Sequence, residues 1–102
     1  MDSRLRPLAH VLRARNRLHK RRLCNHPRVV SGFCEIAQNV IKGRVPLNTR
    51  QRRRWRRNKR KLRALISRRN SYRHKSKLLQ TGGFLNLLLP VAKTLLSGLG
   101  IL

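Results

Sequence analysis

The stretch RVVSGFCEIAQNVIK, residues 28–42, carries the clearest structural pattern in the sequence. Counted from Val29, its apolar residues fall at positions i, i+4, i+7, i+8, i+11 and i+12. This spacing places them on one face of an α-helix. Gly43 follows directly, and glycine is typical of the residue that ends a helix. We therefore predict a helix here, with one face that must be buried against a neighbouring segment.

Segments on both sides of this stretch also have helical patterns. Residues 4–24 carry apolar residues at helical spacing among Arg and Lys, which predicts one basic helix. After the turn GRVPLN, Asn48 and Gln51 stand three residues apart, as in the capping box that begins a helix. The helix predicted next, over residues 49–69, has a thin apolar stripe and is otherwise cationic. A further break leads to a brief helix ending at Leu79.

The organisation predicted from these patterns is all-α, because no segment alternates apolar and polar residues as a strand does. Residues 1–28 form a basic N-terminal arm, residues 29–81 a helical basic region and residues 82–102 a hydrophobic C-terminal tail. We expect the small basic helices to be partly disordered without a partner, because short isolated helices are marginal in water. The tail is expected to form an amphipathic helix.

The charge of the chain points to a polyanionic partner. Its 102 residues contain 27 Lys and Arg against 2 Asp and Glu, which gives a formal net charge of +25. Self-repulsion of this size opposes compaction unless a polyanion neutralises it. We therefore expect nucleic acid as the first partner and an anionic membrane as the second. Arg is more frequent than Lys, and its planar fork matches phosphate oxygens in pairs.

The cationic residues are densest between Arg50 and Lys77. No helix-turn-helix or zinc-finger spacing occurs in the sequence, and phosphate contacts carry no sequence information, so we predict binding to duplex DNA without sequence preference. Trp55 lies in this cluster, and we interpret it as the anchor of a thin helix interface rather than a base-stacking residue. The cluster also fits a nuclear import signal. The residues predicted to contact DNA are Arg50, Arg52, Arg53, Arg54, Arg56, Arg57, Lys59, Arg60, Lys61, Arg63, Arg68 and Arg69.

Enzymatic chemistry is not expected. Glu35 is the only carboxylate outside the N-terminus, whereas acid–base pairs, carboxylate-held magnesium and Asp-supported triads need more acids. We expect Glu35 to pair with a nearby Arg or to contact the partner of the apolar helix face. Residues 1–28 contain no apolar run typical of a signal peptide, so we expect synthesis in the cytosol.

A metal site is not expected either. Cys24, His26 and Cys34 give only three ligands, and His10 or His19 would have to complete the set across a helix. Structural zinc takes four ligands at recognisable spacing. Two cysteines do not make a disulfide framework, so we interpret them as ordinary free thiols. We predict neither a metal nor a cofactor.

The stretch FCEIAQNVIKGRVPLNTRQRRRWRRNKRKLRALISRRN, followed by KSKLLQTGGFLNLLLP, resembles a small basic protein of adintoviruses and Polinton (Maverick) elements. These are double-stranded DNA viruses and virus-like transposons of animals. The resemblance covers roughly residues 29–92 and lies in the order of a Cys-Glu helix, a Val-Pro-Leu turn, a basic helix and Gly-Gly-Phe-Leu before a Leu-rich tail. Residues 1–28 are similar only in being basic. That family is in turn similar to the precursor of the adenovirus core peptide mu, which is packaged with the genome.

The resemblance implies a virion core protein that binds and condenses double-stranded viral DNA, located in the virion and the host nucleus. It also implies processing, because adenoviral precursors are cut by a viral cysteine protease at glycine-containing sites. QTGG before Phe84 is similar to such a site, with cleavage between Gly83 and Phe84, and LSGL before Gly100 is similar to a second. The other interpretation is that the paired glycines end a helix.

The tail from Phe84 has a narrow polar face that includes Pro90 and Lys93. This pattern suits a helix that lies in a membrane interface or packs against a protein better than a spanning helix. Three roles stay open: a membrane-active helix, contact with a capsid protein, and an anchor removed at maturation. The alternatives for the whole chain are a membrane-active minor capsid protein and a ribosomal structural protein. The residues predicted to contact capsid or membrane are Phe84, Leu85, Leu88, Leu89, Leu95 and Leu96.

Overall fold

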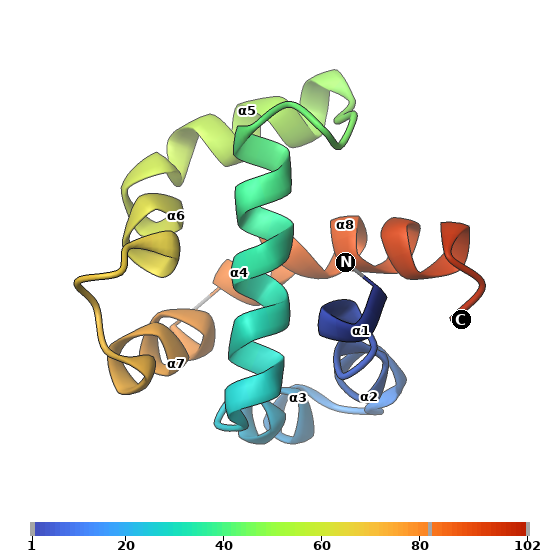
Figure 1. The fold of residues 1–102 in the computed structure, drawn as a ribbon, viewed down its shortest axis with the longest axis vertical. Coiled ribbons are helices and arrows are strands. Elements are labelled where there is room, and N and C mark those ends of the chain that lie inside the picture. The colour runs from blue at the N-terminus through green and yellow to red at the C-terminus, as the bar shows by residue number, and fades with distance from the viewer. Residues whose placement is uncertain (1, 82, 102) are drawn as a thin grey trace.

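The computed structural model describes residues 2–81 and 83–101, with the side chains of residues 2 and 3 excepted. These residues are helical with short connections, and no strand occurs among them, so the predicted all-α class is confirmed (Figure 1). The helices are α1 (Asp2–Leu5), α2 (Leu8–Arg13), α3 (Arg17–Leu23), α4 (Pro27–Ile41), α5 (Thr49–Arg57), α6 (Lys59–Ile66), α7 (Tyr72–Gln80) and α8 (Phe84–Gly98).

Helix α4 is the centre of the fold and contacts α1, α2, α6, α7 and α8 (Figure 1). It begins at Pro27, whose missing N–H is not needed in the first turn. It ends before Gly43, which has φ 74° and whose N–H donates to the carbonyl of Val40 at 3.0 Å. Most of the predicted apolar face is buried, including Phe33 and Ile36, each 0% exposed. The periodicity therefore predicted this helix correctly.

The single basic helix predicted over residues 4–24 is wrong, because three short helices occupy this segment. Pro7 has no N–H to continue the helix from α1, so the chain turns there. Asn16 begins α3, and its side chain accepts a hydrogen bond from the N–H of His19 at 2.8 Å. The turn after α1 brings Leu5 and Leu8 into the core beside α4.

The cationic helix predicted over residues 49–69 is divided at Asn58 and ends at Ile66. The side chain of Asn58 donates to the carbonyl of Arg54 at 2.8 Å, and such local bonds compete with a regular helix. The predicted capping box is present. The N–H of Gln51 donates to Asn48 Oδ1 at 2.8 Å, and the N–H of Asn48 donates to Gln51 Oε1 at 3.1 Å.

Helix α8, which lies in the segment predicted to be a hydrophobic tail, packs into the core. It contacts α2, α4, α5 and α7. Phe84, Leu88 and Leu96 are at most 1% exposed, whereas Pro90 and Lys93 on the polar face are exposed. The cationic helices carry few apolar side chains of their own, so α8 supplies a large share of the apolar area that the fold buries.

The described residues form a compact body, whereas partial disorder of the basic helices without a partner stays a prediction. The radius of gyration of the Cα atoms is 12.4 Å. A folded domain of this length has a radius of gyration of about 13 Å, against about 30 Å for an unfolded chain. None of the described helices is long and apolar enough to cross a membrane.

Candidate nucleic-acid interface

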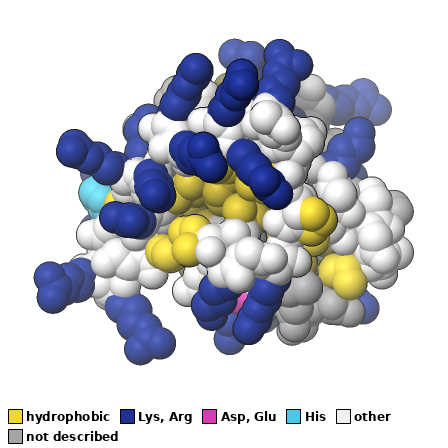
Figure 2. Space-filling model, turned by 90° about the horizontal axis from the view of Figure 1, so that it is seen from above, with side chains coloured by type: hydrophobic (Ala, Val, Ile, Leu, Met, Phe, Trp, Pro, Cys, Tyr) yellow, Lys and Arg dark blue, Asp and Glu magenta, His cyan; other side chains and the backbone are white. Residues whose placement is uncertain are grey.

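The residues predicted to contact DNA lie on α5, on α6 and on the turn before α7, and every one of them is exposed. The view in Figure 2, which looks onto the α5 end of the molecule, shows Lys and Arg side chains projecting from this surface. We call the surface formed by these twelve residues the cationic surface. Its members fall into three sets by position.

The first set stands on the outer side of α5. Arg50, Arg53, Arg54 and Arg57 line one shallow hollow together with Thr49. None of these Arg residues has a hydrogen bond or an ion pair from its side chain within the described part of the chain. Their guanidinium groups are therefore free to bind phosphate oxygens.

The second set forms a row along α5 and α6. Arg52, Arg56, Lys59 and Arg63 are spaced by four, three and four residues, which keeps them on one side of the helix pair. They border a groove whose other residues are apolar, including Trp55. The third set, Arg60, Lys61, Arg68 and Arg69, lies on α6 and the turn after it.

Helix α5 is held to the fold by one buried side chain, that of Trp55, which is 5% exposed. Helix α6 is held to the fold by Leu62 and Leu65, which are 2% and 0% exposed. The indole of Trp55 is therefore an anchor, as our interpretation of the sequence expected, and it is not placed to stack on a base. A thin apolar stripe thus holds a helix pair that is cationic on its remaining sides.

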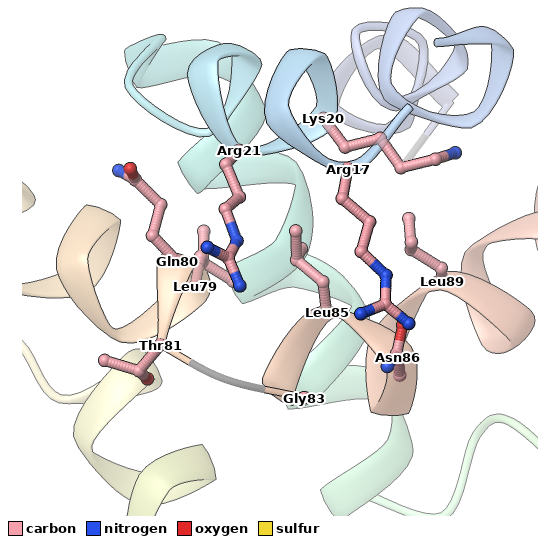
Figure 3. A pocket seen from close by; sticks show the side chains of 10 residues that line it. All are labelled: Arg17, Lys20, Arg21, Leu79, Gln80, Thr81, Gly83, Leu85, Asn86 and Leu89. Carbon is pink, nitrogen blue, oxygen red and sulfur yellow. The ribbon is translucent and has the colours of Figure 1, made fainter. Parts of the chain in front are cut away.

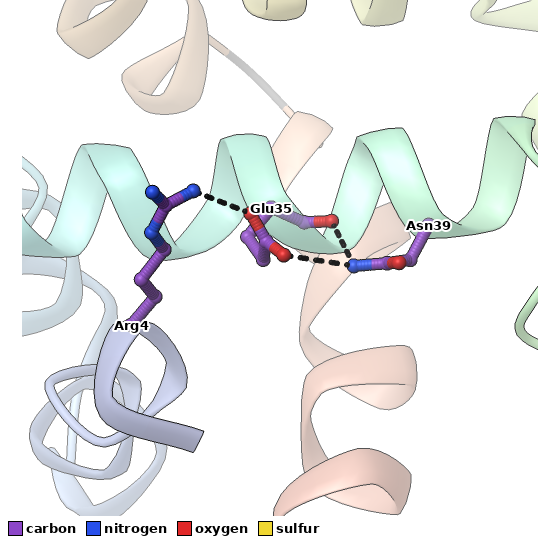
Figure 4. A network of polar contacts seen from close by, with 3 residues as sticks. All are labelled: Arg4, Glu35 and Asn39. Atoms are coloured by element: carbon purple, nitrogen blue, oxygen red, sulfur yellow. Dashed lines mark hydrogen bonds and ion pairs between the residues drawn. The ribbon is translucent and has the colours of Figure 1, made fainter. Parts of the chain in front are cut away.

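No described carboxylate balances the cationic surface. Glu35 is occupied elsewhere: its Oε2 accepts from Arg4 Nη1 at 3.1 Å, and its Oε1 accepts from Asn39 Nδ2 at 3.3 Å (Figure 4). Partial burial raises the pKa of the Glu35 carboxyl, but the hydrogen bonds from Arg4 and Asn39 and the charge of Arg4 outweigh burial and hold the pKa below its ordinary value. The expected pairing of Glu35 with an Arg is present.

A second cationic cluster was not predicted from the sequence. Arg17, Lys20 and Arg21 of α3 line a small cavity of about 40 Å³ against α8, where Leu85 and Asn86 form part of the opposite wall (Figure 3). In the sequence these residues counted only as members of a basic arm, because nothing local indicates that α3 packs near α8. Figure 1 shows α3 at the opposite end of the molecule from α5.

The predicted processing site begins at Gln80, the last residue of α7, and its cleavage point precedes Phe84, the first residue of α8. Gly83 is exposed with φ 74°, whereas Phe84 is 1% exposed and begins α8. Gly82 lies outside the described residues. A protease needs an extended, accessible segment, so cleavage between Gly83 and Phe84 would require the first turn of α8 to open. The second predicted site begins at Leu96, which is buried in the core.

The residues predicted to contact capsid or membrane do not form one exposed face. Phe84, Leu88 and Leu96 are buried, and Leu85, Leu89 and Leu95 are half-buried against the core. Contact of the whole set with an external surface would therefore require α8 to leave the core.

The two cysteines are free thiols in apolar surroundings. Burial raises the pKa of Cys24 to about 11. Burial also raises the pKa of Cys34, which the charge of Lys75 opposes, and its Sγ donates to the carbonyl of Leu65 at 3.2 Å. Within residues 2–81 and 83–101, no group of three His, Cys, Asp or Glu side chains is placed to hold a metal ion.

Comparison with known proteins finds no significant match to this chain among protein-family models, curated proteins or solved structures. The distinguishing properties of the cationic surface are the exposure of all its members and the lack of acidic neighbours among the described residues.

Proposed function

We propose that this protein binds double-stranded DNA through the phosphate backbone, without sequence preference, and helps to compact it as a core protein of a virion does. The observation that carries the proposal is the cationic surface: twelve exposed Arg and Lys residues on α5, α6 and the following turn, with no described carboxylate among them. Binding releases the counterions condensed on DNA, which favours association strongly at low salt.

The shape of the α5–α6 pair supports contact with duplex DNA. An α-helix with its side chains is about 10–12 Å across, and the major groove of B-DNA is about 12 Å wide. Cations on several sides of α5 would reach phosphates on both walls of such a groove. Contacts of this kind position a protein without reading the bases.

Compaction requires one molecule to hold two stretches of duplex or to bend one. The exposed cations of α3 support the first route, because Arg17, Arg21 and Arg22 lie at the end of the molecule opposite α5 (Figure 1). The longest dimension of the fold is 32 Å. A molecule with cations at both ends of such a body would bridge neighbouring duplexes.

The virion setting rests on the resemblance to the adintovirus and Polinton protein and on the net charge of +25. We also propose contact of α8 with a capsid protein or an anionic membrane, but only for a form of the protein in which α8 has left the core. Anionic lipid would engage the same exposed cations as DNA does, so the experiment must separate the two partners.

The test is DNA binding across a salt series, measured by fluorescence anisotropy with two duplexes of unrelated sequence. We expect equal affinities for both duplexes and a fall of about 0.9 log units in the binding constant, per log unit of salt, for each phosphate neutralised. Replacing Arg53, Arg54 and Arg57 together by Gln should flatten the slope by up to about three such contacts. Vesicles of phosphatidylglycerol provide the comparison with lipid.

The matched control replaces Arg17, Arg21 and Arg22 by Gln, which removes the same charge from α3. We expect this variant to keep most of its affinity for a single short duplex but to lose the aggregation of long DNA seen by light scattering. Equal losses of short-duplex affinity in both triple variants would contradict a defined interface on α5. A wild-type slope of only one or two phosphates, or tighter binding to vesicles than to DNA, would remove DNA as the main partner.

A further inference from the structure

A groove runs between the end of α4 and the α5–α6 pair, and nothing in the described chain covers it. Its volume is about 590 Å³, within the range of about 300–1,000 Å³ that ligand sites occupy. Figure 2 shows hydrophobic side chains at the floor of a hollow at this end of the molecule, surrounded by Lys and Arg. The apolar residues that line the groove are Val40, Ile41, Leu47, Trp55, Leu62 and Ile66.

The groove leaves apolar area in contact with water. Ile41 belongs to the apolar row of α4, yet its side chain is 51% exposed, while Phe33 on the same row is fully buried. Val40, Leu47 and Ile66 are only half-buried. Contiguous exposed apolar area rimmed by polar residues is typical of a binding site.

The charges along the groove indicate what kind of occupant fits. Arg52, Arg56, Lys59 and Arg63 border it in one row, and no acidic residue is among the residues that line it. The row therefore extends over α5 and α6 and is not a single point of charge. A second copy of a chain with a net charge of +25 would be repelled, so the occupant must be acidic.

The buried indole adds an independent observation. Trp55 lines the groove, and its Nε1 is the buried side-chain polar atom that lacks a hydrogen-bond partner among the described residues. An unpaired buried donor lowers stability, and native structures rarely keep one without a reason. Because Nε1 itself is closed to solvent, an occupant with an oxygen acceptor would pair with it only after the groove wall shifts.

We propose that the groove binds an acidic amphipathic helix of a partner protein. Apolar side chains at i, i+3 or i+4, and i+7 of that helix enter between α4 and the α5–α6 pair, and its Asp and Glu residues face the row from Arg52 to Arg63. An extended row of cations matches an extended row of carboxylates, whereas a lipid headgroup presents its charge at one point. This site goes beyond DNA binding, because Arg50, Arg53 and Arg54 lie outside the groove and stay free for phosphate.

The test uses the full chain and a synthetic helical peptide with Leu at these spacings and Glu on both flanks. A scrambled peptide of the same composition has the same charge without the apolar row. Binding is followed by anisotropy of the labelled peptide and by the fluorescence of Trp55, the single Trp of the chain. At physiological ionic strength, where exposed charges are screened, we expect the patterned peptide to bind at least about tenfold more tightly than the scrambled one.

Two matched variants locate the site. Ile41→Asp places a charge in the groove and should weaken binding of the patterned peptide at least about tenfold, as the loss of a central interface side chain does. Leu18→Asp makes the same change on α3, where Leu18 is 59% exposed and does not line the groove, and should leave peptide binding unchanged. Both side chains are exposed, so both variants should retain the helical circular dichroism spectrum.

Equal binding of the patterned and scrambled peptides would overturn the proposal, because it would reduce the site to charge alone. Equal effects of Ile41→Asp and Leu18→Asp would overturn it as well. The groove would be assigned to lipid by two results together. The protein would not prefer the patterned peptide, and Ile41→Asp would weaken its binding to phosphatidylglycerol vesicles. Binding of a short duplex through Arg50, Arg53 and Arg54, which lie outside the groove, should persist in both variants. Failure of the groove is therefore distinguishable from failure of DNA binding.

Discussion

Helices α4 and α5 are separated by one turn, yet they serve opposite purposes in the molecule. Helix α4 has 15 residues and contributes Val29, Phe33 and Ile36, among others, to the core. Helix α5 has nine residues and contributes only Trp55. The comparison teaches that the core residues and the residues proposed to bind a polyanion lie on different helices, so mutation should separate their effects.

The largest effect is expected from Phe33→Ala in α4. Phe33 is 0% exposed, and loss of a buried aromatic ring costs about 3–5 kcal/mol in the free energy of unfolding. Arg53→Ala in α5 is the control: Arg53 is exposed, so its effect should stay within about 0.5 kcal/mol. Urea denaturation followed by circular dichroism measures both. A similar loss in the two variants would refute the division between α4 and α5.

A smaller effect is expected at Gly32, where α1 and α2 approach α4. A Cβ atom there would lie 2.8 Å from the carbonyl oxygen of Arg4 and 2.9 Å from Leu8 Cγ. Gly32→Ala should therefore destabilise the protein by about 1–3 kcal/mol, although Ala is the better helix former. Gly98→Ala in α8 is the matched control, because its Cβ would meet nothing within 4 Å. There the free energy of unfolding should stay the same or rise by up to about 1 kcal/mol.

Removal of the capping box should weaken the cationic helix without touching the core. Asn48→Ala removes the acceptor for the N–H of Gln51 and should cost about 1 kcal/mol in unfolding free energy. The cost should be accompanied by weaker DNA binding, since α5 carries the outer cations. Asn86→Ala in α8, where Asn86 is exposed, provides a comparison and should change neither property. An Asn48→Ala variant with unchanged stability would show that the cap does not set the start of α5.

The smallest effect is expected from the ion pair between α1 and α4. Because the pKa of Glu35 in the folded protein lies below its ordinary value of 4.5, its ionised form stabilises the fold above that pH. The stabilisation is lost as the pH falls below about 4.5 through the lower folded-state pKa. It should amount to at most about 1 kcal/mol, since Arg4 is largely exposed. Glu35→Gln should remove this part of the pH dependence, as measured by urea denaturation at several pH values.

The sequence was most informative where the residues that determine a helix lie within that helix or directly beside it. The apolar spacing around Phe33 predicted α4, and the pairing of Asn48 with Gln51 predicted where α5 begins. The exposure of the cationic surface also followed, because unpaired Arg and Lys side chains are rarely buried. Pro7 and Asn16 are residue types that often interrupt or begin a helix. The prediction of a single helix over residues 4–24 did not take them into account.

The remaining differences depend on which elements meet in space. An apolar pattern says that one face of α8 is covered, but not whether a membrane, a partner or the same chain covers it. The exposure of Ile41 has the same origin, because the spacing shows which face of α4 it lies on but not whether a neighbouring helix covers it. The α3 cluster was missed because its position opposite α5 depends on the path of the whole chain.

The burial of α8 has a consequence for the order of events during synthesis. A ribosome completes α5 and α6 before α8, yet Phe84, Leu88 and Leu96 of α8 are needed to close the core. The nascent protein therefore carries its Arg-rich helices while its apolar residues are still uncovered. The core closes only when α8 leaves the ribosome. By then the Arg-rich helices α5 and α6 have already had the opportunity to meet a polyanion.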